Sequence, residues 1–333
     1  MQSYNLINGN IITLNHHYPI VESITISHGK IEGINSPNAK YESKDLLGAT
    51  VIPGFIDAHF HLKNFGKRLN MLNLKGLSSI ALIRDKIKKK LKKLPPNSWL
   101  IGFGWDQNLW TNKEYPTSDI LNDITLDHPI YLTRIDGHSA WVNNLAIIRA
   151  GLSINQINNI DGARVINDCI MIDNAMNFFK SCLPVDTKEQ VKLWIKTAVK
   201  EANKMGITGV HDAWQDATII EVIKELIQEK EFTIRCYGML GSNDTSLLKN
   251  FFSQGHYFNE YLTIRSVKAF IDGALGSRGA ALHDPYCDDT NNCGLILISK
   301  EEFSQLAYDC FNNNFQLNTH AIGDRGNTYV LDC

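Results

Sequence analysis

Residues 207–240, ITGVHDAWQDATIIEVIKELIQEKEFTIRCYGML, indicate the fold class because they predict a strand, a helix and a second strand in succession. We predict the first strand over 207–212, the helix over 216–229 and the second strand over 232–240. Strands that alternate with helices of this length are typical of βαβ units on a parallel sheet.

The same alternation continues on both sides of this unit. Thr187 is a suitable N-cap, and Gly206 a suitable C-terminal residue, for a helix over 187–205. The later pattern predicts a short helix, a long strand, a Gly-rich loop, a helix, a strand and a last helix, over 245–253, 261–271, 272–299, 299–313, 315–320 and after Gly323. The sequence therefore predicts an α/β fold.

The N-terminal part has a different pattern. Residues 1–50 predict short strands, and Asn8-Gly9, between two apolar pairs, suits a type I′ hairpin. The apolar run at 49–62, ATVIPGFIDAHFHL, predicts a buried strand that begins near Phe55.

The segment between these two regions is interpreted as an inserted subdomain. Residues 78–94 predict a helix with one apolar stripe, and its lysines mostly cover the opposite, solvated side. Residues 97–185 show little periodicity and are too long for a loop, so we expect them to fold as part of the insertion.

Composition and charge exclude several classes of protein. The chain has 333 residues, with 33 Lys and Arg against 35 Asp and Glu, and this balance gives no reason to expect nucleic acid or an anionic membrane as partner. The first residues, MQSYNLINGN, lack the basic start and apolar stretch expected of a secretory signal, and no apolar run approaches the ~20 residues that span a bilayer. The cysteines number 7 and include no C-x-x-C, so we expect a cytoplasmic protein with reduced thiols.

Chemistry-bearing side chains occur where the predicted strands end. His59 and His61 stand at positions i and i+2 of a strand, so both imidazoles point to one face and can bind a divalent metal. Lys268 is either a carboxylated lysine between two metals, a lysine that acts on substrate, or an edge lysine with its amine in solvent. His320 is a metal ligand, an acid–base group or a structural histidine.

Other enzyme motifs are absent from the sequence. It contains no G-x-S-x-G nucleophile elbow, no Walker A lysine and no H-E-x-x-H. Gly102-Phe103-Gly104 lacks the third glycine of a dinucleotide fingerprint. The strand-end cluster is therefore the main chemical signal.

Six blocks carry a resemblance to a known family. They are VIPGFIDAHFHL (51–62), GFGWDQNLW (102–110), TRIDGHSAWVN (133–143), GITGVHDA (206–213), VKAFIDGALGSRGAAL (267–282) and THAIGDRGN (319–327). In these blocks the sequence resembles the amidohydrolase superfamily and, within it, amidohydrolase family 3, the YtcJ-like metal-dependent hydrolases related to N-substituted formamide deformylase.

The resemblance implies a fold, a cofactor and a reaction. The fold is a distorted (β/α)8 barrel beside a β-sandwich built from both chain ends. The cofactor is one or two divalent ions, normally zinc, with His59 and His61 matching ligands on strand one, Lys268 a position that is often carboxylated on strand four, and His320 the histidine of strand five. In the implied reaction, a metal-bound hydroxide attacks the carbonyl of a small amide-like substrate and breaks a C–N bond. Lys268 and His320 are the residues we expect to take part in catalysis.

The sequence departs from the family's pattern near its end. The family's further His on strand six and Asp on strand eight have no counterpart, so we expect an incomplete barrel of about five strands. The predicted domains are 1–50, part of the sandwich, and 51–333, a partial barrel with an insertion at about 64–187. Two readings follow: part of a C–N hydrolase, or an inactive truncated remnant with residual metal binding.

Substrate contacts are expected from the insertion and from the Gly-rich loop. The candidates are Trp105, Asp106, Arg134, His138 and Arg278. Arg278 could clamp a carboxylate or carbonyl, while Trp105 has the alternative of belonging to the core of the insertion. The sequence leaves the substrate's identity open, and a homo-oligomer is compatible with it.

Overall fold

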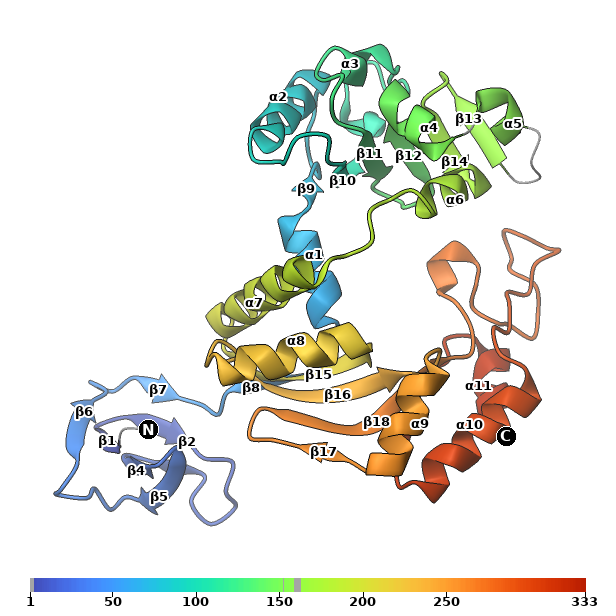
Figure 1. Cartoon of the computed structure of the whole chain (residues 1–333). Coiled ribbons are helices and arrows are strands. Elements are labelled where there is room, and N and C mark those ends of the chain that lie inside the picture. The colour runs from blue at the N-terminus through green and yellow to red at the C-terminus, as the bar shows by residue number, and fades with distance from the viewer. Residues whose placement is uncertain (1–2, 152, 159–162) are drawn as a thin grey trace.

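The computed structural model describes residues 3–151, 153–158 and 163–333 (Figure 1). Residues 1–2, at the start of the predicted N-terminal segment, and residues 152 and 159–162 of the predicted insertion lie outside the described residues.

The largest layer of the fold is a parallel sheet that carries the strand-end residues. Its parallel strands lie side by side in the order β8 (Phe55–Phe60), β15 (Ile207–Gln215), β16 (Arg235–Gly241), β18 (Leu262–Phe270) and β19 (Gln316–His320). The short β17 (Tyr257–Phe258) pairs with β18 in the antiparallel sense. Within the described ranges β8 and β19 are not paired with each other. The predicted α/β class is confirmed, and the sheet stays open.

Helices cover this sheet in the predicted alternation with strands. They are α1 (Leu62–Asn70), α7 (Lys188–Lys204), α8 (Ala217–Gln228), α9 (Thr245–Gln254), α10 (Lys300–Asn312) and α11 (Asp324–Leu331). Capping boxes begin two of them, at Thr187 with Gln190 and at Ser299 with Glu302. Ile195 of α7 and Ile223 of α8 are fully buried in the core that these helices share with the sheet.

The strand that carries His59 is exposed, so the prediction of a buried strand near Phe55 is wrong. Phe55 is 56% exposed and Ile56 67% exposed. The reason is position: β8 pairs with β15 on one side only among the described strands, which leaves its other side without a neighbour.

The insertion is more regular than the sequence indicated. It contains a sheet in the order β13-β14-β12-β11-β10-β9, although residues 97–185 show little periodicity in the sequence. Its strands are β9 (Leu72–Asn73), β10 (Leu100–Trp105), β11 (Ile130–Arg134), β12 (Ser139–Val142), β13 (Ala163–Ile166) and β14 (Ile170–Asp173). Its helices are α2 (Ile80–Leu91), η1 (Gln107–Leu109), α3 (Asp119–Asn122), α4 (Asn144–Ala150), α5 (Ile154–Asn158) and α6 (Asn174–Lys180).

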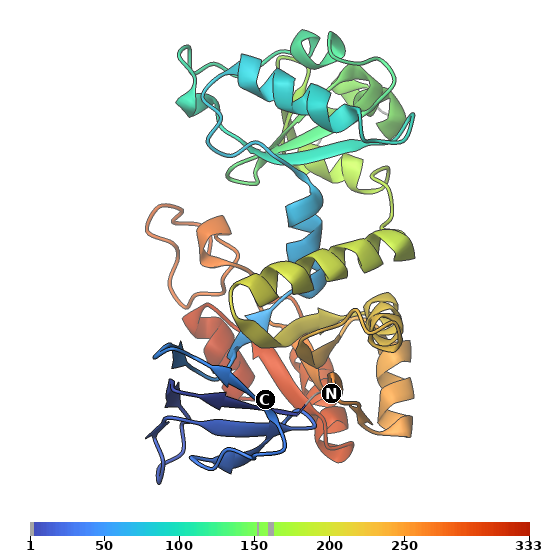
Figure 2. The ribbon, with the colours of Figure 1, turned by 90° about the vertical axis from the view of Figure 1, so that its left-hand side faces the viewer.

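Two small sheets form the N-terminal segment, which lies at the opposite end of the molecule from the insertion (Figures 1 and 2). One has the order β5-β4-β1-β6 and the other β3-β2-β7. Their strands are β1 (Tyr4–Ile7), β2 (Asn10–Ile12), β3 (Ile20–Val21), β4 (Ile24–Ser27), β5 (Lys30–Ile34), β6 (Glu42–Asp45) and β7 (Thr50–Val51).

The predicted hairpin at Asn8-Gly9 does not form. Asn8 has the positive φ of 56° that such a turn uses, but β1 pairs with β4 and β6 while β2 pairs with β3 and β7. The dipeptide instead carries the chain from one sheet to the other. A Cβ on Gly9 would lie 2.3 Å from Cδ1 of Leu46, so any larger residue there requires the Leu46 side chain to move.

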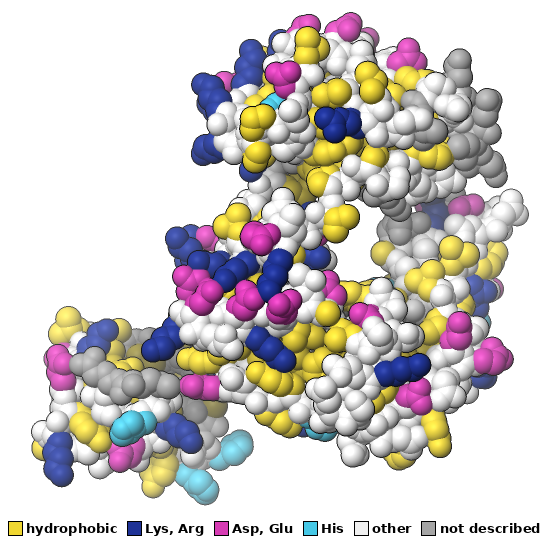
Figure 3. Space-filling model, viewed as in Figure 1, with side chains coloured by type: hydrophobic (Ala, Val, Ile, Leu, Met, Phe, Trp, Pro, Cys, Tyr) yellow, Lys and Arg dark blue, Asp and Glu magenta, His cyan; other side chains and the backbone are white. Residues whose placement is uncertain are grey.

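Charged side chains of both signs interleave over α7 and α8 (Figure 3). Lys188 pairs with Glu221 and Glu225, and Lys192 pairs with Glu225 and Glu229. This mixed surface agrees with the balanced charge of the chain. Across the described ranges, no helix combines the length and apolar character needed to cross a membrane.

Candidate active site

A hollow of about 480 Å³ lies where the parallel strands end, and it brings together residues far apart in the sequence. His59 of β8, Lys268 of β18 and His320 of β19 all line it. The other lining residues are small, apolar or amide side chains: Ala58, Ala213, Met239, Leu317, Asn318, Thr319, Ala321 and Ile322.

His61, the residue after β8, lies beside His59 but is not among the residues that line the hollow. The two ring centroids are 5.4 Å apart. Burial lowers the pKa of His61, and the nearby charges of His59 and Lys268 lower it further. A lowered pKa favours the neutral imidazole, which is the form that binds a metal.

Lys268 is buried, which excludes the reading of an edge lysine with its amine in solvent. Its residue exposure is 4%, and burial lowers its pKa. Nζ lies 5.2 Å from the ring centroid of Phe270, and no carboxylate of the described chain is within ion-pair distance of it. A buried amine without an anionic partner is costly, and such groups concentrate at functional sites.

Two buried carboxylates support the site, and the sequence analysis missed both. Asp212 of β15 accepts the backbone N–H of Leu62, the residue after His61, at 3.0 Å. Asp272, two residues after β18, is 1% exposed, and its Oδ1 lies 3.8 Å from Nε2 of His320. The available signal was the position of each Asp at or just after a predicted strand end, in GVHDA and FIDGA.

Two of these side chains suit a divalent cation as nitrogen ligands. His59 and His61 are adjacent, and the lowered pKa of His61 favours its ligating form. Within the described ranges, no three His, Cys, Asp or Glu side chains gather closely enough to hold an ion. The imidazole pair fits as part of a larger ligand set, because His59 shares its hollow with Lys268 and His320.

The comparison with protein families decides where this chain belongs. The model of the amidohydrolase family matches residues 43–332, which is most of the chain and includes the whole parallel sheet. The chain belongs to the amidohydrolase family. The resemblance seen in the sequence blocks is thereby confirmed.

Curated relatives of this amidohydrolase match it along almost its whole length. It is 28% identical to the putative amidohydrolase YtcJ of Bacillus subtilis, over 97% of this chain and 64% of the relative. It is 23% identical to the N-substituted formamide deformylase of Arthrobacter pascens, over 100% of this chain and 65% of the relative. The chain thus spans less than two thirds of the length of these relatives.

A solved structure shows the same architecture. An uncharacterized metal-dependent hydrolase from Pyrococcus furiosus superposes with a TM-score of 0.80 and 25% identity, covering 99% of this chain and 69% of the other.

Trp105, predicted as a substrate contact, is instead in the core of the insertion. Its exposure is 0%, and its Nε1 donates to the carbonyl of Leu132 at 2.7 Å. Its ring packs against those of Trp110 and Trp141, at centroid distances of 6.2 and 6.1 Å. The alternative reading of Trp105 as a core residue is the one the structure supports, because three indoles fill the centre of this subdomain.

The other predicted substrate residues lie outside the hollow that contains His59. Arg134 is bonded to Asp106 and Asp136, and the backbone N–H of His138 also donates to Asp136. Arg278 lies on the Gly-rich loop, where Nε and a terminal nitrogen donate to the carboxylate of Asp288 at 3.2 and 3.0 Å. Asp106, Arg134, His138 and Arg278 are not among the residues that line the hollow. Their contact with substrate stays a prediction.

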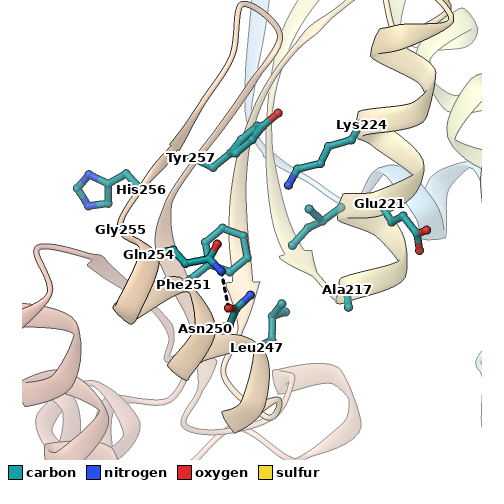
Figure 4. Close-up of a pocket in the computed structure, with 11 residues that line it drawn as sticks. Ala217, Glu221, Lys224, Leu247, Asn250, Phe251, Gln254, Gly255, His256 and Tyr257 are labelled. Carbon is teal, nitrogen blue, oxygen red and sulfur yellow. Dashed lines mark hydrogen bonds between the residues drawn. The ribbon is translucent and has the colours of Figure 1, made fainter.

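A second hollow, of about 450 Å³, lies on the outer side of the sheet between α8 and α9 (Figure 4). Lys224 lies over the ring of Tyr257 at 4.1 Å, and Gln254 donates to Asn250 at 2.8 Å. It shares no lining residue with the hollow of His59. We therefore place the chemistry at the strand ends.

Proposed function

We propose that this amidohydrolase is a metal-dependent hydrolase of C–N bonds in small amide-like molecules, with its reaction at the strand-end hollow. The observation that carries the proposal is that His59, Lys268 and His320 line one hollow and His61 lies beside His59. The family and the metal-dependent hydrolase from Pyrococcus furiosus support a hydrolase of this kind.

His59 and His61 are the residues that would hold a divalent cation, which we propose to be zinc, in one or two copies. Lys268, in carboxylated form, and His320 would complete the ligand set from the neighbouring strands. A cation held there supplies Lewis acidity, which activates water and polarises a carbonyl oxygen.

The chain's own residues supply the surroundings of the reaction. Met239, Leu317 and Ile322 give the hollow an apolar wall that would pack on the non-reacting part of a small substrate and exclude water. Lys268 and His320 line the same hollow, so a cation held there would lie beside this wall.

An amide-like substrate is favoured over other hydrolysable groups by one relative. N-substituted formamide deformylase acts, by its name, on a formamide C–N bond. The reading of an inactive remnant has less support, because a buried lysine, which is costly without an anionic partner, lies on the same hollow as His59 and His320.

The test is metal-dependent release of amine. The purified chain is incubated with Zn²⁺ or Mn²⁺ and a panel of N-formyl and N-acyl amines, and Zn²⁺ affinity is measured in parallel by competition with a chromophoric chelator. We expect release that requires metal and that His59→Ala and His61→Ala abolish, while His16→Ala, an exposed histidine of the N-terminal segment, has no effect. Release without metal, or release and Zn²⁺ affinity unaffected by the first two substitutions, contradicts the proposal.

A further inference from the structure

Asp272 is a buried carboxylate that joins three separate pieces of backbone. Its Oδ2 accepts the N–H groups of Ala281 at 2.9 Å and Gly323 at 2.7 Å, and its Oδ1 accepts that of Ile322 at 2.9 Å. The first donor lies at the end of the Gly-rich turn that follows β18, and the other two lie just after β19. Three charge-assisted bonds satisfy the carboxylate and fix these segments to one another.

The segments that bond to Asp272, at Ala281 and at Ile322–Gly323, are packed closely against each other through their backbones. A Cβ on Gly323 would lie 1.8 Å from the carbonyl oxygen of Ala281. A Cβ on Gly326, in α11, would lie 2.7 Å from Oδ2 of Asp272. The carboxylate therefore has almost no room to move without displacing its neighbours.

His320, the last residue of β19, lies beside Asp272 and the turn after β18, and its contacts there orient the imidazole. Its Nε2 lies 3.4 Å from the carbonyl oxygen of Gly273 and 3.8 Å from Oδ1 of Asp272. A carbonyl oxygen only accepts, so the contact with Gly273 requires the proton to be on Nε2. The ring of Phe270 packs on the imidazole, with centroids 5.1 Å apart, and limits its rotation.

We propose that Asp272 is a positioning residue for His320. It holds the turn after β18 against the end of β19, so that the imidazole keeps its proton on Nε2 toward Gly273 and leaves Nδ1 as the nitrogen able to bind a divalent cation. This inference rests on the proposed function, which makes His320 a ligand. Partners that bond to the second nitrogen of a ligating histidine commonly fix its tautomer and orientation.

The tautomer of His320 provides a test that does not depend on activity. In the chain labelled with ¹⁵N-histidine, long-range ¹H–¹⁵N spectra report which ring nitrogen carries the proton, and His320→Gln assigns the signal. We expect Nε2–H in the native chain. We expect Asp272→Asn to shift the population toward Nδ1–H and to weaken Zn²⁺ binding by ~10–100-fold, the usual effect of losing such a partner.

A second substitution covers the case in which Asp272→Asn fails to fold. Gly326→Ala keeps every hydrogen-bonding group and places its Cβ against the carboxylate of Asp272, which must shift together with its neighbours, so we expect the same change of tautomer with a smaller loss of Zn²⁺ affinity. Leu226→Ala, a fully buried side chain of α8, is the control for general destabilisation and should leave the tautomer unchanged.

Two results overturn the inference: a proton on Nδ1 of His320 in the native chain, or native tautomer and Zn²⁺ affinity in both Asp272→Asn and Gly326→Ala. Failure of the proposed function is recognised separately. If His320→Gln leaves Zn²⁺ affinity unchanged, His320 is not a ligand, and Asp272 then has no effect on metal binding through it. The tautomer of His320 still shows whether Asp272 orients the imidazole.

Discussion

Oδ1 of Asp212 accepts the backbone N–H of Leu62 at 3.0 Å, so the end of β15 holds the chain where β8 gives way to α1. Leu62 is the first residue of α1 and directly follows His61, and its N–H has no partner within the helix. The other oxygen accepts Nε2 of Gln215 at 3.2 Å. The carboxylate thus fixes the backbone that carries the candidate ligand.

The position of Asp212 predicts a pH-dependent stability. Burial raises the pKa of Asp212 to about 7, whereas in the unfolded chain the carboxyl has a pKa of about 4. Between these values the folded chain binds more protons than the unfolded chain, so the free energy of unfolding falls as pH rises from about 4 through about 7. Asp212→Asn removes this pH-dependent contribution to the free energy of unfolding, because an amide does not titrate. The variant should be more stable than the native chain near pH 8, by a margin that shrinks toward pH 5.

The surroundings of residue 212 can accommodate the amide of an Asn side chain. Oδ1 of Asn keeps the bond to Leu62. The Asn N–H group can donate to Oε1 of Gln215, which has no hydrogen-bond partner in the described part of the chain, once the Gln amide is flipped. Urea unfolding of both chains across this pH range measures the margin, with Asp85→Asn on the exposed face of α2 as control. A margin that does not change with pH refutes the prediction.

Replacement of Lys268 by Met should stabilise the protein and impair its metal site. Met fills the same volume without a buried charge, so we expect the free energy of unfolding to rise by about 1–3 kcal/mol, the usual cost of an unpaired polar group. Zn²⁺ binding should weaken at the same time. Chemical unfolding and chelator competition measure the two effects, with the exposed Lys249→Met as control. A loss of stability would indicate a partner for the amine that offsets its burial.

Arg134 is expected to stabilise the insertion, because its guanidinium joins several side chains. Nε donates to Gln107 at 2.8 Å, and the terminal nitrogens bond to Asp106 and Asp136. The single ammonium of Arg134→Lys cannot reproduce this fork, so we expect a loss of about 1–3 kcal/mol and faster proteolysis in the segment 106–138. Arg149→Lys on the exposed side of α4 is the control. A higher KM at native stability would instead support the predicted substrate contact.

The unpaired side of β8 should promote self-association. Exposed apolar side chains on an unpaired strand offer a template for another chain, and Ile56 is 67% exposed there. We expect sedimentation velocity to show concentration-dependent association that Ile56→Lys reduces. Val185→Lys, 88% exposed in the segment between α6 and α7, is the matched control. Equal association of the native chain and Ile56→Lys would show that β8 is not the contact.

Local interactions account for the features that could be predicted from the sequence. The capping boxes at Thr187 and Ser299 join residues three apart, so the starts of α7 and α10 are visible in the sequence. His59 and His61 lie together because only one residue separates them, one histidine near the end of β8 and the other directly after it. The order of helices and strands from 187 to 331 follows from the same short-range rules.

Tertiary structure decided the features that depend on distant partners. Strand propensity made β8 a strand, but only the sheet order shows that, among the described strands, one side of it has no neighbour and its apolar residues are exposed. The sequence is compatible with Trp105 as a substrate contact or as a core residue, and only the packing of the insertion assigns it to the core. Asp212 and Asp272 bond to backbone groups 150 and 51 residues away. Hydrogen bonds over such separations leave no periodicity in the sequence, because the chain brings the two groups together only when the whole sheet has formed.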